Sequence, residues 1–304
     1  MTQRKSDTPA ATGGGLPMAV GAYLIWGLLP LYLRLVHQVP PFEFVGWRIV
    51  FTLPLCLAFI AARRQFGDLL VALRQPRVVA MLALSSLLIG ANWLIYIAAI
   101  MNGHVFATSL GYYINPLVNV LIGTVFLHER LSRLQWAAVG IAAIGVVVLA
   151  WGARDMVWIA LALAGSFSAY GVVRKLVPVG SLPGLTIESA ILYLPAVAVV
   201  VLYAAGPQGS AMGTSAAMSL LIALSGVLTA VPLLLFALAA RRMDLSTLGF
   251  VQFLSPTIVF VLGLTVFGEP LRPVQLVSFV LIWTAIALFV ADLLRRRSAA
   301  KPPA

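Results

Sequence analysis

The sequence predicts an all-α integral membrane protein in which ten transmembrane helices form two inverted five-helix repeats. Three observations support this fold class: an apolar composition, ten apolar runs of spanning length, and a motif that occurs twice. Of the 304 residues, 62% are hydrophobic and only 10% are charged, and the mean hydropathy is +1.03. A soluble domain is close to half apolar and a quarter charged. The composition therefore excludes a soluble enzyme, a disordered chain and, with one cysteine, a disulfide scaffold.

The apolar runs set the expected elements, because a helix needs about 20 apolar residues to cross a bilayer. The expected spans are 17–36, 43–62, 78–101, 104–127, 134–151, 157–175, 184–204, 216–240, 245–267 and 273–294. We expect a disordered tail at 1–16, a first repeat at 17–151, a second repeat at 157–294 and a basic tail at 295–304. The first span is interpreted as an anchor and not as a signal peptide.

The charges predict the orientation of these spans. With the amino terminus inside, 16 of the 20 Lys and Arg residues fall in cytoplasmic segments. Such a bias sets membrane topology, so both termini are expected in the cytoplasm of a bacterial inner membrane. The net charge of +11 is then a topology signal. A nucleic-acid partner is not expected, since the aromatic residues lie in the apolar runs and not among the basic ones.

The second half of the chain repeats a pattern from the first half. Five positions recur without a gap after 140 residues: Pro116, Gly123, Glu129, Leu131 and Gln135 are matched by Pro256, Gly263, Glu269, Leu271 and Gln275. Five spans separate the copies, and an odd number of crossings inverts the second copy. Inverted repeats are typical of transporters, whose substrate site lies near the midplane between the halves.

Motifs for enzymatic chemistry are missing from the sequence. It contains no HExxH motif, no Gly-rich phosphate loop and no cluster of metal ligands. The three histidines, His37, His104 and His128, all fall at predicted span ends. We therefore expect no enzyme activity, no cofactor and no metal.

Two charged residues lie clearly inside apolar runs, Arg48 in the second span and Glu188 in the seventh. A charge in hydrocarbon costs about 2.5–3.5 kcal/mol on insertion scales, so such residues tend to face a cavity or a partner. Gating or ion coupling is one interpretation, and snorkelling to the interface is the other. The two residues are expected at opposite depths, which argues against a direct ion pair between them.

The fourth and ninth spans carry the main candidate site. Helical spacing places Tyr112, Asn115 and Asn119 on one face, and Pro116 frees a backbone carbonyl there. The symmetric span has Gln252, Ser255 and Pro256 at the corresponding positions. Paired proline interruptions predict a transporter's binding site. The alternative is that these polar groups only hold the bundle together.

The third span adds a second polar and aromatic face. Asn92 and Tyr96 share this face with Trp93 beside it, and Pro232 stands at the symmetric position of Asn92. Such residues either line a cavity for planar or amphipathic substrates or serve packing. Glu129 and Glu269 follow the ends of their spans and are expected to cap helix amino termini.

Several segments together resemble the RarD branch of the EamA transporters, which belong to the drug/metabolite transporter (DMT) superfamily. They are NWLIYI at 92–97, NGHVFATSLGYYINPLVNVLIG at 102–123, ERLSRLQW at 129–136, SFSAYGVVRK at 166–175, PGLTIES at 183–189 and STLGFVQFLSPT at 246–257. The resemblance extends over about residues 17–292. It implies the EamA/DMT fold, cytoplasmic termini and a central cavity. Members of this branch carry a chloramphenicol-sensitivity label.

The resemblance also implies site residues. The polar or aromatic positions that match are Glu43, Arg48, Asn92, Tyr112, Asn115, Asn119, Glu188 and Gln252. In one departure, Ala107 stands where the family pattern has an acidic residue, and in another Ala98 replaces a tryptophan. The first departure removes a carboxylate on which a coupling scheme could rest.

The resulting hypothesis is a secondary carrier that moves a small organic solute, a drug or a metabolite, by alternating access in the efflux direction. Its expected partners are that solute, the lipid bilayer and a proton as candidate coupling ion. An uncoupled metabolite or amino-acid facilitator is the alternative within transport. A membrane partner protein that transports nothing is the alternative from another class.

Overall fold

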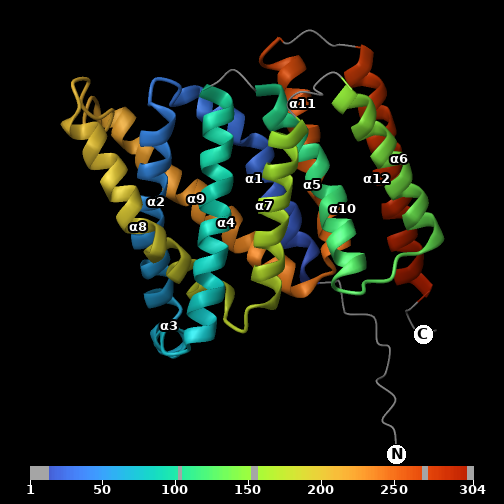
Figure 1. The fold of residues 1–304 in the computed structure, drawn as a ribbon, viewed down its shortest axis with the longest axis horizontal. Coiled ribbons are helices and arrows are strands. Elements are labelled where there is room, and N and C mark those ends of the chain that lie inside the picture. The colour runs from blue at the N-terminus through green and yellow to red at the C-terminus, as the bar shows by residue number, and fades with distance from the viewer. Residues whose placement is uncertain (1–13, 102–104, 152–156, 269–272, 300–304) are drawn as a thin grey trace, which may run out of the picture.

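The computed structural model describes residues 14–101, 105–151, 157–268 and 273–299, and every regular element in these ranges is an α-helix (Figure 1). The helices are α1 (Leu16–Leu35), α2 (Pro41–Ala62), α3 (Phe66–Leu73), α4 (Pro76–Met101), α5 (Val105–Val125), α6 (Arg133–Ala150), α7 (Val157–Leu176), α8 (Ser181–Ala205), α9 (Ala216–Arg242), α10 (Leu245–Gln252), α11 (Leu254–Thr265) and α12 (Pro273–Ala299).

Nine of the described helical segments are long and apolar enough to cross a membrane, with α10 and α11 counted together as one. The shorter apolar stretch Leu110–Val125 in α5 is the tenth segment. The predicted all-α membrane fold is thus confirmed.

The two halves correspond helix by helix and pack on each other. The helices α1, α2, α4, α5 and α6 match α7, α8, α9, the α10–α11 pair and α12 in order. Helix α1 packs against α9 and α11, while its counterpart α7 packs against α4 and α5. Helices α2 and α8 pair with each other, as do α6 and α12. This exchange of partners between the halves is the packing that an inverted repeat produces.

Two features of the helices differ from the sequence prediction. Helix α3 was not expected, because its eight residues are too few to span a bilayer, and exposed Phe66 and Leu70 mark an apolar face. The expected interruption occurs in the ninth span, where α10 ends at Gln252 and α11 begins at Leu254. In contrast, α5 and α9 continue through Pro116 and Pro232 as single helices.

The ends of the bundle differ in charge. The lower end in Figure 1 holds α3, the start of α1 and the end of α12. Arg63, Arg77, Lys175 and Arg242 belong to the helix ends on this side, which we call the basic end. The opposite end, called the mouth end, holds the connections from α1 to α2 and from α8 to α9.

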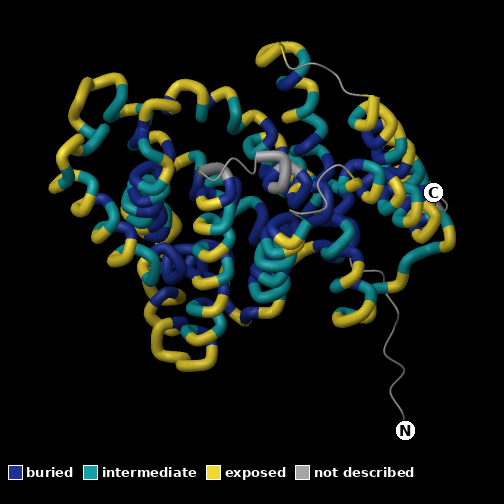
Figure 2. The backbone as a smooth tube through the Cα atoms, turned by 45° about the horizontal axis from the view of Figure 1, so that its top comes forward, coloured by how far each residue is buried: buried dark blue, intermediate teal, exposed yellow. Residues whose placement is uncertain are grey.

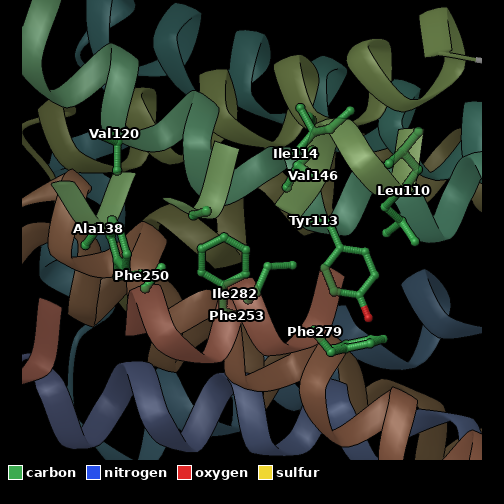
Figure 3. Packing of buried hydrophobic residues seen from close by; sticks show 14 of the residues in the cluster. Leu110, Tyr113, Ile114, Val120, Ala138, Val146, Phe250, Phe253, Phe279 and Ile282 are labelled. Carbon is green, nitrogen blue, oxygen red and sulfur yellow. The ribbon is translucent and has the colours of Figure 1, made fainter. Parts of the chain in front are cut away.

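Buried residues concentrate at the centre of the bundle (Figure 2). One cluster contains residues of α5 and α6 and of the helices α10 through α12. Figure 3 shows its members Tyr113, Phe250, Phe253 and Phe279. A second cluster joins α1, α7, α9 and α10. Its largest fully buried side chains, Tyr23, Tyr170, Phe236, Met243 and Leu245, fill the interior towards the basic end.

Candidate substrate cavity

A cavity of about 1600 Å³ lies between the two halves. Its lining includes His37 and Val39 from the α1–α2 connection, Trp151 after α6 and Phe267 after α11, so it opens at the mouth end. Towards the basic end, its lining reaches Tyr23, a member of the second buried cluster, and Gln252, whose Oε1 lies 3.5 Å from the Tyr23 hydroxyl. The cavity is therefore open at one end of the bundle and closed at the other.

The structure places most of the sequence-predicted site residues in this lining. The lining includes Asn92, Trp93, Tyr96, Tyr112, Asn115, Gln252, Ser255, Pro256 and Arg48. Two predicted residues, Asn119 and Glu188, do not line it. Asn119 is 1% exposed and Glu188 is 3% exposed, so both lie within the packed protein. Pro116 and Pro232 are also absent from the lining.

Hydrogen bonds between the halves hold the deep polar residues in place. The Ser168 hydroxyl of α7 donates to Asn115 Oδ1 of α5 at 2.6 Å. The Asn119 amide donates to Gln252 Oε1 at 3.0 Å, and the Tyr23 hydroxyl approaches the same oxygen at 3.5 Å. The predicted polar face of α5 thus divides by depth: Tyr112 faces the cavity and is 49% exposed, while Asn119 lies below the floor.

Two further side chains of the first half donate hydrogen bonds to backbone carbonyls of the second half. Tyr113 of α5 donates from its hydroxyl to the carbonyl of Pro256 at 3.2 Å. On α4, the Asn92 amide donates to the carbonyl of Leu163 at 2.8 Å and approaches Ser166 Oγ at 2.9 Å. These contacts tie α5 and α4 of the first half to α11 and α7 of the second.

Arg48 lies in the wall of the cavity and is partly buried. Its Nε donates to Thr229 Oγ1 of α9 at 3.0 Å. Its guanidinium carbon lies 5.3 Å from the Trp93 ring centroid and 5.8 Å from that of Phe44, within cation–π range. The structure therefore places Arg48 at the cavity and not in a snorkelling position.

Glu188 is paired, and its partner Arg174 is one of the 16 basic residues that the sequence analysis assigns to cytoplasmic segments. Arg174 of α7 is fully buried, and its Nη1 lies 3.4 Å from Glu188 Oε1. Ser85 of α4 donates a short hydrogen bond to the same oxygen, and Arg174 Nη2 donates to the carbonyl of Ser181 at 2.8 Å. The expectation that only Arg48 and Glu188 are charged inside the spans is therefore wrong. The absence of an Arg48–Glu188 pair is as expected.

A polar cluster closes the basic end. Glu129 Oε1 accepts the Leu245 N–H at 2.7 Å, and Oε2 accepts the Ser246 N–H at 2.9 Å. Lys175 Nζ lies 3.9 Å from Glu129 and donates to the carbonyl of Met243 at 2.6 Å. Burial and the nearby Glu129 carboxylate raise the pKa of Asp244, and Lys175 partly opposes this. Glu129 thus caps α10 in the other half, while Ser132 caps the following helix α6. Glu269 and His104 lie outside the described residues, as does the side chain of Ala107.

Sequence reasoning missed the lining residue Phe167, because it carries no polar signal in an apolar run. Trp26 and Phe167 lie on the wall formed by α1 and α7, and their rings are 5.7 Å apart. Thr229 was not singled out, although it binds Arg48. Among the described residues no group of three or more His, Cys, Asp or Glu side chains could hold a metal ion.

The fold and the cavity define a polytopic membrane protein of the transporter class. The family model for EamA-like transporters matches residues 13–151. The RarD protein of Salmonella typhi is 42% identical over 92% of this chain and 96% of its own length. An uncharacterized transporter of Pseudomonas aeruginosa is 38% identical over 91% of this chain and 93% of its own.

A crystal structure of a protein with 21% sequence identity matches with a TM-score of 0.72, over 94% of this chain and 100% of that chain, which shows a common fold. The chain belongs to the EamA-like transporter family and is of the RarD type. The resemblance noted in the sequence is thereby confirmed, and the family is one of transporters of small solutes and not of enzymes.

Proposed function

We propose that this protein is a secondary transporter that exports a small organic solute by alternating access through the central cavity. One observation carries the proposal: the cavity of about 1600 Å³ lies between the two halves, opens at the mouth end and is closed at the basic end. Ligand sites commonly occupy about 300–1000 Å³, so the space accommodates a small solute and its access path.

The orientation follows from the charges. Positive residues concentrate in cytoplasmic segments of membrane proteins, so the basic end faces the cytoplasm of a bacterial inner membrane and both termini lie there. The cavity then faces outward. In the opposite state, the contacts of Glu129 with α10 and of Lys175 with Met243 would separate and open the cytoplasmic side.

An uncoupled facilitator is the second candidate, because the described cavity lining contains no Asp or Glu that could carry a proton. Proton coupling would depend on Glu188, whose charge Arg174 balances. The Glu188→Gln variant separates the candidates in proteoliposomes. Loss of pH-driven flux with retained folding supports coupling through Glu188, and unchanged flux supports the facilitator.

A cavity-filling substitution tests the transport route. A panel of amphenicols, amino acids and other metabolites is screened by thermal stabilisation of the purified protein, and flux of each stabilising compound is measured in proteoliposomes. Val259 lines the cavity, whereas Val280 is an exposed valine outside the lining. We expect Val259→Trp to reduce both stabilisation and flux at least tenfold and Val280→Trp to change neither. Wild-type flux through Val259→Trp contradicts the central route, and ligand binding without any flux supports a partner protein that transports nothing.

A further inference from the structure

The charged side chains in the described lining of the cavity are all positive. Its described lining contains two arginines, Arg34 and Arg48, and no aspartate or glutamate. The two acidic residues on the neighbouring helices α2 and α8 bond away from the cavity. Glu43 accepts from Trp47 Nε1 at 3.1 Å and from the Ala211 N–H at 2.9 Å, and Glu188 pairs with Arg174. The described wall therefore presents positive charge that no protein carboxylate balances.

Arg48 is positioned to bind an anion deep in this space. Thr229 occupies its Nε, and Trp93 and Phe44 lie against the guanidinium. Within the described ranges no carboxylate lies within 4 Å of it, and its Nη atoms have no hydrogen-bond acceptor. A guanidinium stays protonated and its planar fork matches a carboxylate with two parallel hydrogen bonds. The Nη groups are thus available to a ligand.

Aromatic residues beside Arg48 supply the rest of a binding site. The rings of Tyr96 and Tyr112 lie 6.1 Å apart, and both line the same cavity as Arg48. Neither phenol has a hydrogen-bond partner in the part of the chain that the structure describes, so each is a potential donor to an anion. Trp26 and Phe167 add apolar surface deeper in the cavity. The arrangement fits a carboxylate joined to an apolar or aromatic body.

The unbalanced charge of Arg48 affects the free energy of closing the cavity during transport. In the open cavity water solvates Arg48, but closure of the mouth excludes water, and an unpaired charge in a closed apolar site is costly. A bound carboxylate removes this cost, so the anion favours the closed state by its differential affinity. The inside-negative potential also drives an anion outward, in the proposed direction of transport.

We propose that the cavity binds a small amphipathic organic anion, with its carboxylate on Arg48 and its aromatic or apolar body against Trp93, Tyr96 and Tyr112. This inference rests on the proposed transport function and names the substrate class. The probes are indole-3-acetate, indole-3-acetamide and tryptamine, which share one ring system and differ in charge. Binding is measured by thermal stabilisation and by calorimetric titration of the full-length protein at constant ionic strength.

We expect indole-3-acetate to bind at least tenfold more tightly than the amide or the amine. Arg48→Gln should remove this difference and Arg48→Lys should retain part of it, each variant being compared with its own ligand-free melting temperature. Arg77 is exposed at the basic end, so Arg77→Gln serves as the matched control and should bind like wild type. Equal stabilisation by the same concentration of chloride overturns the proposal.

Flux in proteoliposomes distinguishes failure of the anion site from failure of the proposed transport function. Tighter binding of the amide or the amine, or no binding of any probe, overturns the anion inference. Flux of a neutral compound without flux of the anion overturns it too and leaves the transport function standing. Arg48-dependent binding of indole-3-acetate without flux of any compound supports the anion site and contradicts transport.

Discussion

At the scale of single residues, two glycines allow α5 and α10 to approach each other. A Cβ atom at Gly249 would lie 2.8 Å from the Pro116 carbonyl oxygen and 2.9 Å from Asn119 Cβ, which is closer than real contacts permit. A Cβ atom at Gly123 would overlap the Glu129 carboxylate that caps α10. The recurring glycine of the sequence motif thus leaves room for the acid six residues later.

We expect Gly249→Ala to lower the free energy of unfolding by about 1–3 kcal/mol, because overpacking against backbone forces neighbouring segments apart. Gly140 is the matched control, since a Cβ there meets nothing within 4 Å and its helix α6 gains propensity from alanine. Thermal unfolding in detergent should show a lower melting temperature for Gly249→Ala only. Equal melting temperatures for both variants would show that the α5–α10 contact relaxes freely.

The sequence predicted several site residues but not their depth. The helical spacing of polar residues beside a proline singled out Tyr112, Asn115 and Gln252, and these three residues line one cavity. Asn119 follows Tyr112 by seven residues, which is about 10.5 Å along a helix, and so lies beneath the floor. Only tertiary packing decides where the floor is, and no single-helix pattern contains that information.

Arg174 illustrates the same limit for charges. It stands beside Lys175 near the end of an apolar run, which is typical of an interfacial charge. Its burial depends on Gly184 in α8, where a Cβ atom would overlap its guanidinium, and on Glu188 one turn further. This arrangement involves two helices, so the pattern of α7 alone could not reveal it.

At the scale of elements, the Arg174–Glu188 pair ties α7 to α8, and Ser85 extends it to α4. Removing one partner of a buried pair leaves an unbalanced charge and costs about 3–5 kcal/mol. We therefore expect Arg174→Met to be strongly destabilising and Arg174→Met/Glu188→Gln to recover at least half of the loss. Chemical unfolding in mixed micelles measures both.

The control for this pair is Arg296, whose Nε lies 2.8 Å from Asp292 with 56% of its side chain exposed. Exposed pairs contribute about 0–1 kcal/mol, so Arg296→Met should have little effect. If the double variant is no more stable than Arg174→Met, then the arginine acts through its bond to the Ser181 carbonyl and not through Glu188.

The sequence predicted the number and order of the spanning segments because the bilayer imposes a minimum apolar length on each. It also predicted that the second half is inverted relative to the first, because five crossings separate the two copies of the motif. The short helix α3 remained hidden, since eight residues give too little periodicity. The prolines predicted interruptions but did not show that the ninth span breaks while α5 continues as a single helix. The sequence therefore predicts the elements whose apolar length the bilayer sets, and it does not predict the elements that depend on tertiary contacts.

At the scale of the whole molecule, each half finds its main helix partners in the other half, so a change of access must break contacts between halves at one end. At the basic end, α1 of the first half meets α9 of the second. A Cβ atom at Gly15 would lie 3.3 Å from Arg242 Cβ, close to the separation of about 3.5–4.5 Å found in disulfides. A cross-link at this point would hold the two halves together on the proposed cytoplasmic side.

The chain's only cysteine, Cys56, is buried, so a cysteine pair can be introduced on a Cys56→Ala background. We expect oxidation of Gly15→Cys/Arg242→Cys to reduce proteoliposome flux at least tenfold and a reductant to restore it, because inward opening requires these helix ends to separate. Each single-cysteine variant under the same oxidant is the control and should transport normally. Full flux in protein whose thiols are quantitatively consumed would mean that α1 and α9 move as one body. The proposed separation of the two halves at the basic end would then have to be replaced by a motion within them.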